Sequence, residues 1–227
     1  MSAAGVWAVL AAAGSGERLG GKRPKAFANL AARPLVAESI ERLDASPWVE
    51  AIVVAAPADW EEPTILLAEE LGAGSVRAVV TGGATRTDSV RAGLAEVPAD
   101  TAVVLVHDAA RPFLPDDVVE RVVTALDEGW DAAVAALPLA DTVKRAQGEA
   151  VVETVDRTGL HAVQTPQAFA ADVLRRALAG GSEATDCAGL VEAAGGRVRL
   201  VEGDRRLLKV TTPADLAFVE TLLEAER

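Results

Sequence analysis

Short runs of apolar residues alternate with longer segments of helical periodicity through the first half of the chain and slightly beyond. A short apolar run indicates a buried strand, and apolar residues three and four apart indicate a helix with one buried face. This alternation is typical of βαβ units around a mostly parallel sheet. The predicted strands are 6–12, 51–56, 76–81, 101–106 and 132–137. The predicted helices between them are 34–45, 60–71, 87–95 and 115–128.

The pattern changes after residue 137. From 138 to 160 the chain is polar and rich in β-branched residues, with a Gln-Gly-Glu turn at 147–149, and this predicts a protruding hairpin. A hairpin with so little apolar surface is not stable alone, so we expect it to pack against something, a second subunit being a natural candidate. Helical patterns return at 172–178, 186–194 and 213–224, with a strand at 198–201. We therefore predict one α/β domain over residues 1–227 with an arm at about 138–160.

Composition and charge narrow the classes of partner. Half of the residues are apolar, and the formal net charge of −12 argues against a general nucleic-acid binder, because such binding relies on Lys and Arg. The single cysteine, Cys187, excludes an intramolecular disulfide, and with only two histidines we expect no Cys/His zinc cluster. The N-terminal apolar stretch lacks the basic segment of a secretory signal, and no stretch reaches the roughly 18 to 20 apolar residues of a membrane helix. We expect a cytoplasmic protein with no membrane partner.

A glycine-rich segment after the first predicted strand carries the strongest chemical signal. It reads AAAGSGERLGGKRPK from Ala11 to Lys25. Glycines let the backbone approach a ligand, and successive N–H groups form a nest for an anion such as phosphate. The segment departs from the dinucleotide fingerprint at Leu19, which replaces the third glycine, and from the Walker pattern at Arg23, which replaces the magnesium-binding hydroxyl. It is thus either a different phosphate-binding loop or a flexible loop with solvated charges.

A second candidate site follows the predicted strand at 101–106, in the sequence VHDAARP. In open α/β sheets ligands bind outside the carboxyl ends of strands, which is where Asp108 is expected. A carboxylate facing a phosphate loop is a reasonable Mg²⁺ ligand, because Mg²⁺ often takes one or two carboxylates together with substrate phosphates. The alternative is a structural ion pair between Asp108 and Arg111. We expect His107 to shape the turn through hydrogen bonds rather than to act as a base.

A third candidate follows the predicted strand at 76–81 and reads GGATRTDSV from Gly82. Two glycines, an arginine and several hydroxyls at a junction between strand and helix could bind a ribose, a base edge or a phosphate. The alternative is a helix N-cap formed by Thr85 or Thr87.

Seven ordered stretches together resemble a known family. They are AAAGSGERLG with the following Pro-Lys, RTDSVRAGL, VHDAARPF, DTVKR, VDRTGLHAVQTPQAF, ATDCAGLVEAAG and LLKVTTPADL. Over essentially the whole chain they resemble the 2-C-methyl-D-erythritol 4-phosphate cytidylyltransferases of the non-mevalonate isoprenoid pathway. The resemblance implies a three-layer, Rossmann-like nucleotidyltransferase fold with a protruding β-arm. It also implies a homodimer whose arm reaches the neighbouring active site, and transfer of CMP from CTP with loss of pyrophosphate.

The resemblance further implies a role for individual residues. The catalytic set would be Arg18, Lys25, Arg157 and Lys209. The nucleotide would be bound by Ala12, Ala13, Gly14, Ser15, Gly16, Gly82, Gly83, Ser89 and Ala109. The acceptor would be bound by Asp108, Arg111, Thr142, Arg157, Thr165, Thr185 and Lys209, with Asp108 also binding Mg²⁺. Thr142 and Arg157 would serve the opposite subunit.

Alternatives to this function remain open at the level of sequence. Ribitol 5-phosphate cytidylyltransferases have similar signatures and would share the loop, metal and dimer. A sugar-1-phosphate nucleotidyltransferase using UTP or GTP usually has a longer loop signature. A nucleotide-binding protein without catalysis is opposed by the joint presence of Arg18, Lys25, Asp108 and Lys209. The chain departs from the family at Ala26-Phe27, where Gln-Tyr is frequent, and Lys22 and Arg23 receive no individual role.

Overall fold

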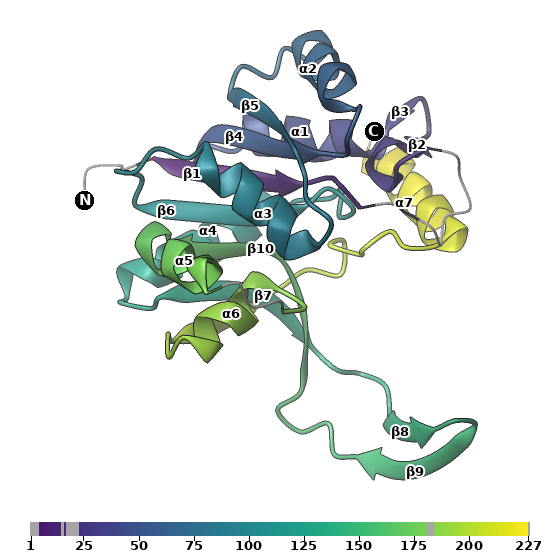
Figure 1. Ribbon diagram of the computed structural model, residues 1–227. Helices are drawn as coiled ribbons and strands as arrows, with labels where there is room; N and C mark the ends of the chain where they lie inside the picture. The colour runs from purple at the N-terminus through teal and green to yellow at the C-terminus, as the bar shows by residue number, and fades with distance from the viewer. Residues whose placement is uncertain (1–4, 15, 17–22, 181–183, 227) are drawn as a thin grey trace.

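The computed structural model describes residues 5–14, 16, 23–180 and 184–226. Its centre is a seven-stranded sheet in the spatial order β11-β7-β10-β6-β1-β4-β5 (Figure 1). The strands are β1 (Val6–Ala11), β4 (Val49–Ala56), β5 (Val76–Thr81), β6 (Val103–Asp108), β7 (Ala132–Pro138), β10 (His161–Ala170) and β11 (Val198–Glu202). Neighbouring strands are parallel except where β10 pairs with β6 and β7. The expected α/β class with a mostly parallel sheet is confirmed.

Helices cover both faces of this sheet, which gives the expected three layers. One face carries α1 (Leu35–Ala45), α2 (Glu61–Glu70) and α4 (Asp116–Asp127), and the other carries α3 (Arg86–Ala95), α5 (Ala171–Ala179) and α6 (Cys187–Ala193). A short 3-10 helix, η2 (Lys25–Phe27), precedes β2 (Asn29–Leu30), which pairs with β3 (Arg33–Pro34). The C-terminal helix α7 (Pro213–Glu226) packs beside β2. Within the described ranges, no helix is long and apolar enough to cross a membrane.

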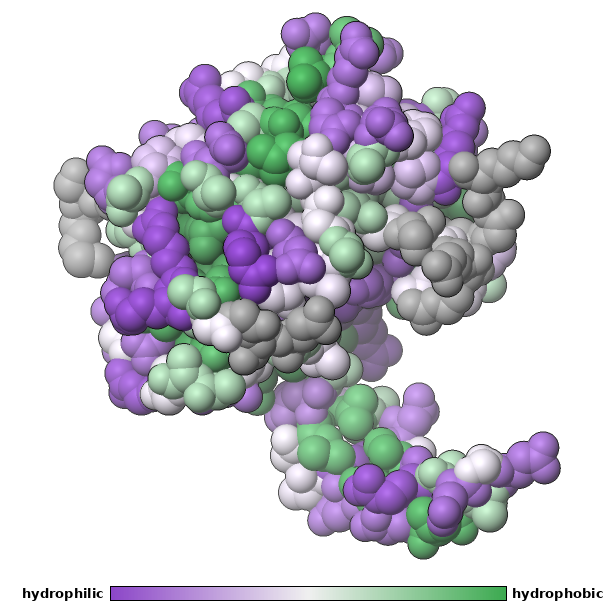
Figure 2. All heavy atoms as spheres, viewed as in Figure 1, coloured by the Kyte–Doolittle hydropathy of each residue, from purple (hydrophilic) through white to green (hydrophobic). Residues whose placement is uncertain are grey.

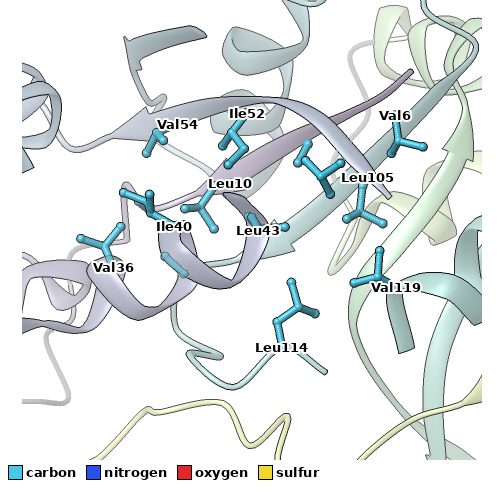
Figure 3. Packing of buried hydrophobic residues seen from close by; sticks show 14 of the residues in the cluster. Val6, Leu10, Val36, Ile40, Leu43, Ile52, Val54, Leu105, Leu114 and Val119 are labelled. Carbon is cyan, nitrogen blue, oxygen red and sulfur yellow. The ribbon is translucent and has the colours of Figure 1, made fainter. Parts of the chain in front are cut away.

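The side chains of β1 show why the sheet needs both helical layers. Leu10 packs in the cluster that includes Ile40 and Leu43 of α1, whereas Val9 belongs to the cluster beneath α3 and α5. Successive residues of a strand point to opposite faces, so a strand covered on both sides is apolar throughout. Figure 3 shows the α1 side, where Leu10 and Ile52 lie over the helix. Each buried side chain of this size contributes about 1.5–3 kcal/mol to folding.

The order of the strands creates a crevice between β1 and β6. From β1 the chain moves outward through β4 to β5 and then returns to the other side of β1 to form β6. Connections that leave two neighbouring parallel strands in opposite directions open a crevice at the carboxyl ends, the usual ligand site of an open α/β sheet. Ala11 is in register with Asp108, and the N–H of Ala109 donates to the Ala11 carbonyl. The glycine loop and the Asp108 motif therefore begin side by side.

A hairpin stands off from the body of the molecule (Figure 1). It consists of the antiparallel strands β8 (Val143–Gln147) and β9 (Ala150–Val155) and lies within the segment 138–160, where we expected an arm. Gly148 at its turn has a φ of +58°, a left-handed conformation that favours glycine. The assignment of residues 1–227 to a single domain stays a prediction.

The sequence patterns do not predict β10, an interior strand of the sheet between β7 and β6. Three of its buried residues are polar, namely Gln164, Thr165 and Gln167. Because neither an apolar run nor a polar-apolar alternation is present, periodicity gives no strand signal there.

Candidate functional site

A cavity of about 590 Å³ lies at this crevice. Its walls come from the glycine loop, the turn between β5 and α3, the end of β6 and the segment that precedes α7. Ten of the expected site residues line it: Ala12, Ala13, Gly14, Gly16, Lys25, Gly83, Ser89, Asp108, Ala109 and Lys209. The fold thus brings together three motifs that are far apart in the sequence.

Lys25, at the end of the glycine-rich segment, lies close to Gly16. Gly16 has a φ of +72°, and a Cβ at this position would lie 2.6 Å from the Cβ of Lys25. The N–H of Lys25 also donates to the carbonyl of Gly14 at 3.4 Å. Only glycine fits this close approach, which holds the half-buried Lys25 at the wall of the cavity.

The turn before α3 is held by hydroxyl groups. The Thr85 side chain accepts from the N–H of Asp88 and so caps the helix, as the structural alternative for this motif expected. The Ser89 hydroxyl accepts from the N–H of Gly83 and donates to the Thr85 carbonyl at 2.9 Å. Thr85, Gly83 and Ser89 also line the cavity. The same turn therefore caps α3 and forms part of the cavity wall.

Gly82 sits directly behind the glycine loop. A Cβ there would lie 2.3 Å from the Cβ of Ala13 and 3.2 Å from the carbonyl oxygen of Ala56. We expect Gly82→Ala to lower the free energy of unfolding by about 1–3 kcal/mol, as overpacking does, and, by displacing Ala13, to weaken binding of the nucleotide that the family resemblance implies. Urea unfolding and calorimetric titration with CTP would measure both. At Gly74 a Cβ meets nothing within 4 Å, so Gly74→Ala is the matched control, and equal effects of the two substitutions would contradict the prediction.

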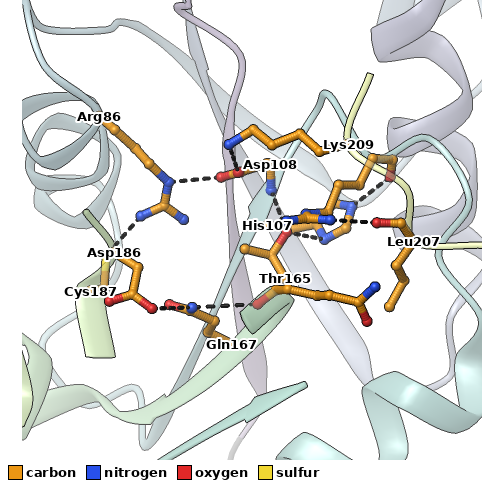
Figure 4. A network of polar contacts seen from close by, with 11 residues as sticks. Arg86, His107, Asp108, Thr165, Gln167, Asp186, Cys187, Leu207 and Lys209 are labelled. Carbon is orange, nitrogen blue, oxygen red and sulfur yellow. Dashed lines mark hydrogen bonds and ion pairs between the residues drawn. The ribbon is translucent and has the colours of Figure 1, made fainter. Parts of the chain in front are cut away.

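Asp108 stands between two cations at the end of β6 (Figure 4). Its Oδ1 accepts from Nε of Arg86 at 2.8 Å, and its Oδ2 accepts from Nζ of Lys209 at 2.6 Å. Burial alone would raise the pKa of this carboxyl, but the charges of Arg86 and Lys209 hold it well below its usual range. The alternative of an Asp108–Arg111 ion pair is wrong, because Arg111 donates instead to the carbonyl of Leu207.

Buried hydrogen bonds connect the backbone of Asp108 to Thr165 and His107. The Thr165 hydroxyl accepts from the N–H of Asp108 at 3.1 Å and lies 3.2 Å from Nδ1 of His107. Nε2 of His107 lies 2.9 Å from the carbonyl of Arg111, so the network assigns the proton to Nε2 and makes Nδ1 the acceptor from Thr165. Burial lowers the pKa of His107 to about 4. His107 shapes this turn as a neutral ring, as expected from the sequence.

The buried His107 predicts an acid-sensitive fold. Between a pH of about 6.5, the usual pKa of histidine, and about 4, the unfolded chain binds a proton that the folded protein does not. Stability contributed by the neutral ring is therefore complete above pH 6.5 and is lost as the pH falls. We expect this residue alone to lower the free energy of unfolding by about 2 kcal/mol between pH 7 and pH 5. Urea unfolding at both pH values should show a smaller fall for His107→Asn, and an identical fall would contradict the assignment.

The segment that carries Lys209 is anchored on both sides. Arg111 binds the carbonyl of Leu207, and the N–H of Val210 donates to the carbonyl of Ala110 at 2.8 Å. At the start of α7, Asp215 accepts from the N–H of Thr212 while the Thr212 hydroxyl accepts from the N–H of Asp215. This reciprocal capping box fixes the helix and the preceding loop, and so places Lys209 against Asp108.

The remaining expected residues that the structure describes do not line the cavity. Gly82, Arg111 and Thr165 lie behind its wall, with the Thr165 hydroxyl engaged by Asp108 and His107. Thr185 is exposed just before α6, and Thr142 and Arg157 are exposed at the base of the arm. Ser15 and Arg18 lie outside the described residues, as does Lys22. The binding roles given to all of these residues stay predictions.

Seven of the described lining residues have no role in the expected set, namely Ala11, Ala26, Ala84, Thr85, Arg86, Ala110 and Thr211. Three of them belong to the turn before α3, whose arginine and hydroxyls already marked it as a candidate. Thr211 follows Lys209 in the sequence, and nothing in its local pattern distinguishes it from a helix-capping residue.

The side chains that line the cavity could hold a metal ion only together with oxygens from a bound ligand. Among the described residues, no group of three His, Cys, Asp or Glu side chains could hold a metal ion. Among the lining residues that the structure describes, Asp108 supplies the one carboxylate, and both of its oxygens already face cations. A single carboxylate suits Mg²⁺ when substrate phosphates provide further oxygens. The residues therefore fit a metal ion that enters together with a phosphorylated ligand.

Comparisons with known proteins point to one family. A family model described as IspD, 2-C-methyl-D-erythritol 4-phosphate cytidylyltransferase, matches residues 6–225. Proteins of that name from Nocardia farcinica and Saccharopolyspora erythraea are 49% and 51% identical to this chain. The alignments cover 96% of this chain in both cases, and 94% and 99% of the relatives. A solved structure of that name from Thermus thermophilus superimposes with a TM-score of 0.79 at 37% identity, covering 95% of this chain and 98% of the other.

Proposed function

This chain belongs to the 2-C-methyl-D-erythritol 4-phosphate cytidylyltransferase family, and we propose that it transfers CMP from CTP to that acceptor. Pyrophosphate is released and 4-diphosphocytidyl-2-C-methyl-D-erythritol is formed. One observation carries the proposal at the level of the site. The glycine loop, Lys25 and the Asp108–Lys209 pair all line one cavity, which lies at the crevice between β1 and β6.

The chemistry follows from the charges. A phosphate oxygen of the acceptor attacks the α-phosphorus of CTP in line, a new P–O bond forms, and the bond to the pyrophosphate leaving group breaks. Negative charge grows on the equatorial oxygens and on the leaving group, and the ammonium of Lys25 and the guanidinium of Arg18 would stabilise it. A phosphate monoester dianion is already a competent nucleophile at neutral pH, so no covalent intermediate is required. The contribution of the protein is then mainly positioning and electrostatics.

We further propose that catalysis uses Mg²⁺ held by Asp108 and the substrate phosphates. When bound, the ion would neutralise phosphate charge and help to orient the triphosphate. The half-exposed Lys209 would leave Asp108 to make room for it, whereas Arg86 is more deeply buried.

We also propose a homodimer formed through the arm. Val151 and Val152 on β9 are 61% and 55% exposed, and Leu160 and Val163 beyond it are 39% and 40% exposed. Figure 2 shows apolar surface gathered on a thin arm that stands away from the body. Exposed apolar surface on a protruding hairpin favours burial against another copy, and such a contact would carry Thr142 and Arg157 toward the partner's cavity. A cytoplasmic location stays a prediction.

Pyrophosphate release by the purified protein tests the proposed function. CTP and Mg²⁺ would be supplied with either 2-C-methyl-D-erythritol 4-phosphate or ribitol 5-phosphate, and UTP and GTP would replace CTP in parallel. We expect release with CTP and the methylerythritol phosphate. A preference for ribitol phosphate would keep the mechanism and change the acceptor. Silence with both acceptors, despite CTP binding, would refute catalysis.

A further inference from the structure

The two counter-ions of Asp108 are held in different ways. Side-chain exposure is 22% for Arg86 and 40% for Lys209, against 8% for Asp108 itself. Arg86 is the first residue of α3, and its Nη1 donates to Sγ of Cys187 at 3.4 Å, while its Nη2 is buried without a partner. Lys209 reaches the same carboxylate from a loop segment at the rim of the cavity. The guanidinium is therefore mostly enclosed, whereas the ammonium is more open to the cavity.

The contacts around Arg86 join three elements. Cys187 begins α6, and the preceding Asp186 caps that helix by accepting from the N–H of Gly189 at 2.9 Å. The other oxygen of Asp186 accepts from Nε2 of Gln167, which belongs to β10. Figure 4 shows this chain of contacts running from Gln167 through Asp186 and Cys187 to Arg86 and Asp108. The position of Asp108 is thus tied to α3, α6 and β10 through one guanidinium.

We propose that Arg86 is a positioning residue that permanently holds Oδ1 of Asp108, so that Lys209 on Oδ2 is the counter-ion free to exchange with substrate. This inference rests on the proposed function, because the exchange takes place when the phosphorylated substrates fill the cavity. A buried carboxylate needs at least one cation at all times, since a lone buried charge is strongly unfavourable. With Arg86 in place, Lys209 can turn toward a phosphate without leaving Asp108 uncompensated. Without Arg86, Lys209 would be the one protein cation on Asp108 until Mg²⁺ binds, so its exchange with substrate would be hindered.

The expected signature is a loss of kcat that depends on the charge of Asp108. We expect Arg86→Gln to lower kcat at saturating substrates on the order of 100-fold, as misplacement of reacting groups does. In the Asp108→Asn background the same change should lower kcat less than about 3-fold, because no charge is left to compensate. Arg86→Lys should retain kcat within about 10-fold of wild type, since an ammonium can also pair with Oδ1.

Binding and stability measurements separate positioning from other roles. CTP affinity, measured by calorimetry without acceptor, should change less than about 5-fold in Arg86→Gln, because Arg86 pairs with Asp108 and is not proposed to contact the nucleotide. Arg91→Gln is the control, since Arg91 lies on the same helix, also pairs with an aspartate and does not line the cavity. Its kcat should match that of wild type. Thermal unfolding of every variant checks that it is folded at the assay temperature.

The outcomes are distinct from those that test the proposed function. Wild-type pyrophosphate release decides the function, independently of Arg86. If Arg86→Gln lowers kcat equally with Asp108 present and in the Asp108→Asn background, the positioning role is overturned. A CTP affinity that falls as far as kcat would overturn it as well. A loss of kcat confined to the protein that retains Asp108, with partial recovery by Arg86→Lys, would support it.

Discussion

Replacing Lys25 with alanine is expected to lower turnover by at least about 100-fold, in line with the loss of one donor that stabilises a developing oxyanion. Lys25 lines the cavity and lies close to Gly16. Its ammonium is a compact charge on a flexible stem, suited to following phosphate oxygens from ground state to transition state. Because the stabilised charge develops during the reaction, the effect should fall on kcat more than on KM.

Steady-state pyrophosphate release by the variant and the wild type measures this effect. Arg23→Ala provides a control from the same loop, because Arg23 is exposed and does not line the cavity. It removes the same amount of charge two residues away, so a change below about 3-fold is expected for it. Near-wild-type turnover of Lys25→Ala would remove Lys25 from the catalytic set.

Replacing Arg157 with alanine is expected to lower kcat/KM for the acceptor on the order of 100-fold, although Arg157 lies outside the cavity of its own subunit. The guanidinium would bind the acceptor phosphate of the partner subunit, and such contacts are often bidentate. Affinity for CTP should be unchanged, because the nucleotide would be bound by the glycine loop and the turn before α3.

Mixing two inactive variants tests the shared site directly. If Lys25 acts in its own subunit and Arg157 acts in the neighbouring one, each mixed dimer of Lys25→Ala and Arg157→Ala has one complete site. An exchanged 1:1 mixture should then recover about a quarter of wild-type activity, since half of the dimers are mixed and each has one of two sites intact. Unmixed variants treated in the same way are the control. Lack of recovery in a mixture shown to exchange subunits would place both residues in one subunit's site.

Much of the fold could be predicted because β1, β4 and β6 are buried on both faces. Such strands must be apolar throughout, so 6–12, 51–56 and 101–106 are recognisable as short apolar runs. Strand β10 escaped prediction for the opposite reason. Its buried polar side chains form hydrogen bonds to other elements, such as that from the Gln164 amide to the carbonyl of Asp204 at 2.9 Å. A strand stabilised by long-range hydrogen bonds leaves no periodic signal.

The same distinction applies to the site. Residues whose constraint is local, such as Gly16 and the Thr85 cap, stand in motifs that can be read along the chain. The ion pair of Asp108 cannot be read in this way, because Arg86 and Lys209 are 22 and 101 residues away from it. Arg111, only three residues away, was the obvious candidate from spacing alone. The turn directs it instead to the carbonyl of Leu207, and proximity in the sequence is therefore a poor guide to charge pairing.

By itself, the sequence determined the α/β class, the position of the glycine loop, the arm and the family, because each rests on local periodicity or on ordered motifs. Only the tertiary structure decided which charges meet at the end of β6 and which hydroxyls turn inward. Those choices depend on how α3, α6 and the segment before α7 converge on one strand end. Burial makes each such pairing strong and selective, since a polar group removed from water must find its partner wherever packing brings one within reach.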